Sequence, residues 1–150
     1  MPLKLISPLY ETFELKKTDE KYGSEGEASF VVIKQAAQHE HERRQQLFAT
    51  LERKFSEIDP NQFSLVQTLS SEELKRTEVW LTMVECNIQD QEGKNLFPSK
   101  KDKAGHSTLN MTQEAFNRNW GLLPPDVCLE IHGFVQEVNK VWAGPLEKDE

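Results

Sequence analysis

A pair of consecutive prolines constrains the fold of this chain most, because Pro124 and Pro125 interrupt a stretch that is otherwise helical in pattern. Proline lacks a backbone N–H and clashes with the preceding helical turn, so a helix tolerates it only in its first turn. A last helix is therefore expected to begin at the prolines and to span residues 124–142. Its apolar side chains recur at three- and four-residue steps and form one stripe: Val127, Ile131, Phe134, Val135, Val138 and Trp142.

A shorter helix is expected directly before the prolines, over residues 112–120. Thr112 is a favourable N-cap residue, and Gly121 is the residue type that commonly ends helices. The two helices and the hinge between them would cover a core supplied by the rest of the chain. Leu129 points away from the apolar stripe of the last helix and is expected to be exposed.

The N-terminal part of the chain predicts a β-hairpin over residues 11–34. Residues 11–17 alternate between apolar and polar, and residues 28–34 are rich in β-branched and aromatic side chains. Two strands alone are marginally stable, so the hairpin must pack on helices. A helix over residues 35–58 follows, in which Glu40 and Arg44 have the spacing and the order of a favourable ion pair.

A further helix is expected over residues 70–88, where Ser70 and Glu73 form a capping-box signature. A strand is the alternative for residues 78–88, because this segment is short and rich in β-forming residues. If the segment is helical, it is apolar on two sides, and it then either lies at the centre of the fold or presents a surface to a partner. Residues 89–109 are expected to form a long loop.

Together these elements predict an α+β fold that is mainly α, in which the N-terminal hairpin packs on a bundle of about four helices. The 150 residues fit a single domain, with a disordered tail over residues 143–150. The formal charge of −7 argues against a nucleic-acid or anionic-membrane binder, because binding phosphates needs a basic surface. Two cysteines, no signal peptide and no membrane-spanning apolar run favour a cytoplasmic protein.

Three candidate chemical sites are weaker than their structural alternatives. His39 and His41 are two residues apart, so on a helix their rings point about 200° apart and cannot share a metal ion. Cys128 and His132 are four residues apart and could form a nucleophile and a base, but both border an apolar stripe, which favours a packed thiol. The segment that begins at Asp90 lacks the glycine that a calcium loop needs. We therefore expect no catalytic residue, no cofactor and no metal site, and a protein that is not an enzyme.

Binding another protein is the role that remains. Aromatic residues and methionine are enriched at interaction surfaces, and the helix expected over residues 70–88 has a second apolar face. The expected partner contacts are Val79, Trp80, Met83, Trp120 and Leu129.

Three runs of the sequence resemble the tail assembly chaperones of long-tailed bacteriophages. They are FVVIKQAAQHEHERR (30–44), EVWLTMVECNIQDQEGKNLF (78–97) and, the most distinctive, MTQEAFNRNWGLLPPDVCLEIHGFVQEVNKVW (111–142). The resemblance implies a largely helical, non-enzymatic helper in the host cytoplasm. Such helpers bind the tape-measure protein, or another tail protein, and keep it soluble during tail morphogenesis. Many are made together with a longer, frameshifted form.

Two other functions are left open by the sequence. One is a structural component of the virion or an adaptor, which shares the expected protein-binding surface and the possibility of self-association. The other is a small hydrolase that uses Cys128 and His132, or the segment of His39 and His41. The hairpin over residues 11–34 would be an N-terminal addition to the largely helical family that the chain resembles.

Overall fold

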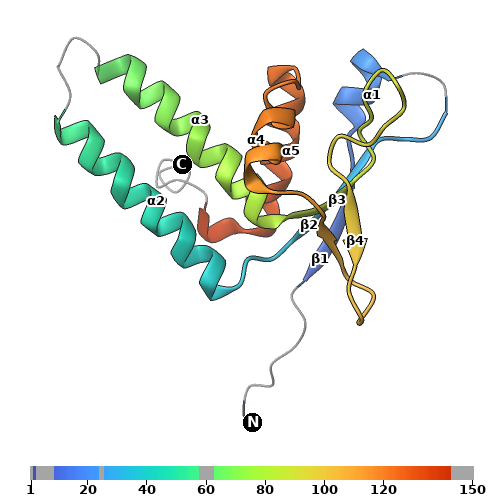
Figure 1. Cartoon of the computed structure of the whole chain (residues 1–150), viewed down its shortest axis with the longest axis horizontal. Coiled ribbons are helices and arrows are strands. Elements are labelled where there is room, and N and C mark those ends of the chain that lie inside the picture. The colour runs from blue at the N-terminus through green and yellow to red at the C-terminus, as the bar shows by residue number, and fades with distance from the viewer. Residues whose placement is uncertain (1, 3–8, 24–25, 58–62, 143–150) are drawn as a thin grey trace.

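The computed structural model of the chain describes residues 2, 9–23, 26–57 and 63–142, without the side chains of residues 55–70 (Figure 1). The predicted tail over residues 143–150 and the predicted helix end near Asp59 lie outside the described residues. The elements follow one another as β1 (Tyr10–Glu14), α1 (Lys16–Tyr22), β2 (Phe30–Lys34), α2 (Gln38–Glu57), α3 (Phe63–Thr82), β3 (Met83–Cys86), β4 (Ser99–Lys101), β5 (Ser107–Leu109), α4 (Gln113–Trp120), α5 (Pro125–Val138) and the short 3₁₀ helix η2 (Lys140–Trp142).

The predicted N-terminal hairpin is present, and it forms part of a three-stranded antiparallel sheet in the order β1-β2-β3. In its register Tyr10 lies opposite Lys34, and Phe13 lies opposite Val31. Val31 and Ile33 are fully buried, so one face of the central strand points into the core. The expected class, α+β and mainly α, is confirmed.

The segment that joins the two hairpin strands contains helix α1, which the predicted hairpin over residues 11–34 did not include. Its first residues have no capping side chain of their own. The Glu130 carboxylate on α5 instead accepts hydrogen bonds from the backbone N–H groups of Lys17 and Thr18, both at 3.0 Å, and from the Thr18 hydroxyl at 2.8 Å. An N-terminal helical turn needs such acceptors, and here they come from a residue that is distant in the sequence.

Helix α3 differs from the predicted helix over residues 70–88 at both ends. It begins at Phe63, so that Ser70 lies within the helix and does not cap it. It ends at Thr82, and the chain continues directly into β3, which pairs with β2. The strand alternative is therefore correct for residues 83–86, because pairing with an open strand edge outweighs the helical pattern.

Helices α2 and α3 form an antiparallel pair that extends away from the sheet, whereas α4 and α5 lie between that pair and the strands (Figure 1). Helix α5 contacts α3, β2 and α1. Its predicted stripe is buried at Val127, Ile131 and Val135. The predicted helix over residues 124–142 is present only as α5, since the backbone leaves the helix at Asn139 and resumes as the 3₁₀ turn η2; the predicted helix over residues 112–120 corresponds to α4.

Aromatic side chains join the layers of the core. Phe97 and Phe116 are both fully buried, and their ring centroids are 5.3 Å apart. Phe13 of β1 stacks on Phe134 of α5 at 4.3 Å. These contacts fix the sheet against the helices that cover it.

The region over residues 89–109, predicted as a long loop, contains the hairpin of β4 and β5. The Asp102 carboxylate accepts hydrogen bonds from Ala104 N–H and His106 N–H at the turn. Gly105 has a positive φ of 86°, which favours glycine. The strands are only three residues long, and the Ser107 hydroxyl reaches Glu85 of β3 at 2.6 Å. The hairpin is thus held to β3 by a contact that no local pattern reveals.

A buried group of polar side chains joins three helices. Glu78 of α3 is 2% exposed, and its carboxylate accepts a hydrogen bond from Arg44 of α2. His132 of α5 lies 2.6 Å from the other carboxylate oxygen. The expected Glu40–Arg44 ion pair is wrong, because Glu40 pairs with Lys34 and Arg44 pairs with Glu78.

Replacing Glu78 with glutamine should destabilise the fold. The substitution keeps the shape of the side chain but leaves Arg44 without its counter-charge in a largely buried position, so we expect a loss of about 3 kcal/mol in the free energy of unfolding. Urea denaturation followed by circular dichroism measures it. The control is Glu72→Gln, which removes only the surface contact of Glu72 with Lys75 and should change stability by less than about 0.5 kcal/mol. Equal effects of the two substitutions would contradict this account.

Replacing Glu130 with alanine should loosen helix α1 selectively. The loss of its N-terminal acceptors is expected to cost about 1–2 kcal/mol and to speed amide hydrogen exchange within Lys16–Tyr22. Glu137→Ala, at an exposed position on the same helix, is the matched control. Unchanged exchange in α1 would show that Glu130 does not hold it.

Candidate protein-binding surface at the α4–α5 hinge

The hinge between α4 and α5 is a defined turn. Gly121 continues the helical backbone with φ −65° and ψ −14°, and Leu122 N–H and Leu123 N–H then donate to the carbonyls of Asn119 and Trp120. Pro124 turns the chain into an extended conformation, and its carbonyl accepts the first amide hydrogen bonds of α5. The backbone is therefore satisfied within the turn, while the Leu122 side chain remains 69% exposed.

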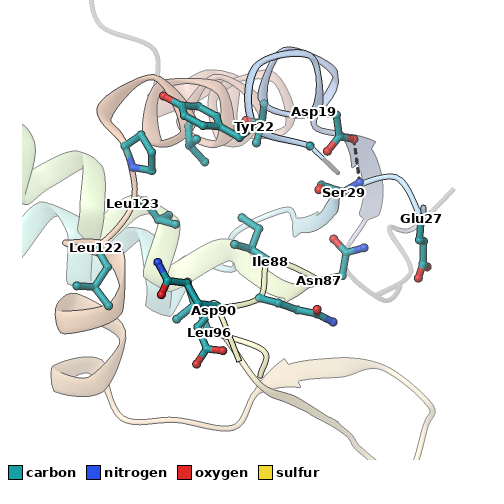
Figure 2. A pocket seen from close by; sticks show the side chains of 16 residues that line it. Asp19, Tyr22, Glu27, Ser29, Asn87, Ile88, Asp90, Leu96, Leu122 and Leu123 are labelled. Atoms are coloured by element: carbon teal, nitrogen blue, oxygen red, sulfur yellow. Dashed lines mark hydrogen bonds between the residues drawn. The ribbon is translucent and has the colours of Figure 1, made fainter. Parts of the chain in front are cut away.

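A cleft of about 810 Å³ opens on one side of the hinge. Its walls come from α1, the segment that leads into β2, the connection between β3 and β4, and the hinge itself (Figure 2). Figure 2 shows Leu122 and Leu123 at one end, Ile88 in the middle, and Asn87, Ser29 and Glu27 at the other end. The apolar lining consists of Ile88, Leu96, Leu122, Leu123, Pro124 and Val127, together with the ring of Tyr22.

The polar part of this cleft is acidic. Three carboxylates line it, those of Asp19, Glu27 and Asp90, and the lining holds no lysine, arginine or histidine. Asp19 accepts a hydrogen bond from Ser29 N–H at 2.9 Å, and Asp90 accepts from two amides of its own loop. Within the described part of the chain none of the three forms an ion pair, so their negative charge is not neutralised locally.

The hinge also borders a second cavity, of about 430 Å³, on its other side. This cavity lies between the C-terminal half of α3 and the start of α5, and Leu123 lines both cavities. Trp120 and Leu129, two of the expected partner contacts, line it, and Leu129 is 60% exposed. Arg76 and Lys75 also border it, so its polar rim differs in charge from that of the larger cleft.

Two of the expected partner contacts, Val79 and Met83, are buried and do not lie on the surface. Val79 is 0% exposed and Met83 is 2% exposed, so neither presents an apolar face to solvent. Helix α3 is apolar on two sides because α2 packs on it from one direction and α4 and α5 from another. Met83 belongs to β3, where its side chain faces the core.

The remaining expected contacts differ in accessibility. Trp80 is half-buried, with its ring 5.3 Å from that of Phe116, and Trp120 is 8% exposed. Leu129 alone is well exposed. Leu122 was not predicted from the sequence, although two adjacent leucines in a turn are an available signal, and neither were Asp19 and Glu27. Only the tertiary arrangement brings these acids opposite the hinge.

The side chains that the sequence offered as candidates for a chemical role make contacts within the fold. His132 faces Glu78, and Cys128 Sγ lies 4.0 Å from the carbonyl oxygen of Trp120. Burial, with smaller contributions from Glu72 and Asp126, raises the pKa of the Cys128 thiol to about 11. His41 Nδ1 accepts a hydrogen bond from the indole of Trp142 at 2.9 Å. Among the described residues no group of three His, Cys, Asp or Glu side chains is placed to hold a metal ion.

The raised pKa predicts that the Cys128 thiol is alkylated slowly. At neutral pH Cys128 is protonated, and a thiol pKa of about 11 in place of about 9 leaves on the order of a hundred-fold less thiolate. Alkylation of the native protein by iodoacetamide should therefore be slow and should accelerate up to pH 10 and beyond, as mass spectrometry of the Cys128 peptide would show. In guanidinium the same thiol should react at an ordinary rate. A native rate that levels off near pH 8 would contradict the assignment.

Comparisons with known proteins identify no relative of this chain. The chain matches no protein-family model, no curated protein and no solved structure. Within the part of the chain that the structure describes, no helix is long and apolar enough to cross a membrane. The hinge and its two cavities are therefore the features of the described structure that bear on a function.

Proposed function

We propose that the protein is a non-enzymatic chaperone of phage tail assembly, which binds the tape-measure protein in the host cytoplasm during tail morphogenesis. The observation that carries the proposal is the pair of exposed leucines, Leu122 and Leu129, each at the rim of a cavity beside the α4–α5 hinge. Single exposed leucines are ordinary on protein surfaces, but cavities beside them offer places for a partner's side chains.

The positions of the three runs that resemble the family support this proposal. The first run covers β2 and the start of α2, the second covers the end of α3, β3 and the following connection, and the third covers α4, the hinge, α5 and η2. Strands β2 and β3 pair, and α5 packs on β2 and α3, so the three runs form one continuous part of the fold. The most distinctive run contains the hinge.

The chemistry of the hinge surface suits a client with amphipathic helices. Partner apolar side chains would cover Leu122 and Leu129, and burying a leucine fully is worth about 1.5–3 kcal/mol. A surface with only two such anchors gives modest affinity. A chaperone needs modest affinity, because its client must leave when tail-tube subunits assemble around it.

Co-expression with fragments of a tape-measure protein tests the proposal. We expect the chain to retain at least one fragment in the soluble fraction, and the double substitution of Leu122 and Leu129 by serine to reduce retention at least about ten-fold, which corresponds to 1.4 kcal/mol. Val141→Ser is the matched control, since Val141 is 82% exposed and lines neither cavity.

Two outcomes would count against the proposal. One is a failure to retain or solubilise any fragment across the whole tape-measure protein. The other is discovery of the protein in purified particles at the stoichiometry of a tail component, which would assign it to the structure of the virion. The free energy of unfolding of each variant must stay within about 0.5 kcal/mol of the parent, since surface substitutions normally have effects of this size.

A further inference from the structure

We propose that the cleft between α1 and the α4–α5 hinge binds a short, positively charged, amphipathic segment of a partner protein. This inference rests on the proposed function only for the identity of the partner. The chemistry of the segment follows from the cleft itself. Its hinge end carries Leu122 and Leu123, its α1–β2 end carries Asp19 and Glu27, and Asp90 lies beside Leu96 (Figure 2).

Charge complementarity selects a cationic segment. Asp19, Glu27 and Asp90 line the cleft, its described lining contains no basic residue, and the whole chain carries a formal charge of −7. Bringing a negatively charged side chain to such a site costs free energy, whereas lysine or arginine side chains are attracted and steered to it. Glu27 is exposed and forms no hydrogen bond or ion pair with any described residue, so its carboxylate is available to a partner.

The apolar end requires that the segment also carry an apolar side chain. Leu122 is 69% exposed, and Ile88 and Leu96 are half-buried in the same lining. A volume of about 810 Å³ lies in the range of pockets that enclose a small ligand or a few side chains, and is too small for a folded domain. The occupant that fits is therefore a segment with an apolar residue at one end and a basic residue at the other.

The walls of the cleft are held in place before a partner arrives. The Asp19 carboxylate ties α1 to Ser29 N–H, and Glu130 ties α1 to α5. At the mouth, the Tyr22 hydroxyl donates to Asp126, which also accepts from Lys21 at 3.1 Å. A site that is already ordered loses little conformational entropy on binding.

Two synthetic peptides provide the probe. Both have the same leucine spacing, and one carries lysine where the other carries glutamate. Each is labelled with fluorescein and titrated with the full-length protein by fluorescence anisotropy. We expect the lysine peptide to bind and the glutamate peptide not to bind, and we expect the Kd of the lysine peptide to rise at least about five-fold between about 50 and about 300 mM NaCl.

Matched variants locate the binding. Glu27→Lys and Leu122→Ser should each weaken binding of the lysine peptide at least about five-fold. Glu137→Lys makes the same charge change at an exposed position on α5 outside the cleft, and should change the Kd less than about two-fold. Leu129→Ser removes an exposed leucine at the other cavity and should have an equally small effect.

Three results would overturn the inference: equal binding of the glutamate peptide, equal weakening by Glu27→Lys and Glu137→Lys, or no effect of Leu122→Ser. The first would show that charge does not select the segment, and the second that attraction to the protein is diffuse. If a tape-measure fragment is retained but Glu27→Lys and Leu122→Ser leave its binding unchanged, the proposed function stands and this inference fails. If the lysine peptide binds in the cleft while no tape-measure fragment is retained, the inference stands and the proposed function fails.

Discussion

The arrangement of the helices depends on the buried carboxylate of Glu78. It bonds Arg44 of α2 through one oxygen and faces His132 of α5 through the other, so three helices meet at one side chain. The same guanidinium lies 5.4 Å from the ring centroid of Trp142, and the Trp142 indole donates to His41 of α2. A buried carboxylate is costly unless its oxygens are satisfied, so the helices are restricted to the arrangement that satisfies them.

Helix α5 carries this constraint to the sheet and to the proposed binding surface. Near its C-terminus, the Asn139 side chain accepts from Ala36 N–H at 2.7 Å and donates to the carbonyl of Lys34, which holds the end of β2. Near its N-terminus, Glu130 and Asp126 hold α1. The hinge wall of the cleft is thus part of the start of α5, and the wall formed by α1 is held by polar contacts with α5. The positions of Leu122 and of Asp19 therefore depend on that single helix, whereas Asp90 is held by amides of its own loop.

How far the sequence predicted the fold depends on where each element finds its partners. Helices α4 and α5 could be placed because their signals are local: the Thr112 hydroxyl caps α4 by accepting from Ala115 N–H, and proline opens α5. Helix α1 and strand β3 could not, because one is capped by Glu130, more than a hundred residues away, and the other exists through pairing with β2. The capping signature at Ser70 failed for a different reason, since α3 already begins at Phe63 and Ser70 lies within the helix. The Glu40–Arg44 pair failed because Lys34 and Glu78 are better placed.

The sequence predicted part of the apolar residues of the candidate site but none of its carboxylates, which determine its charge. Leu129 was identified because periodicity separates it from a buried stripe, but no pattern places Asp19 and Glu27 opposite Leu122, since three segments must fold together to do so. The combination matters for the proposed chaperone role. Apolar anchors alone would favour any exposed hydrophobic chain, whereas an acidic end rejects acidic segments and makes the attraction sensitive to salt. A client held by few apolar contacts and by screened charges dissociates readily, and release is the step that a permanent tail component would not need.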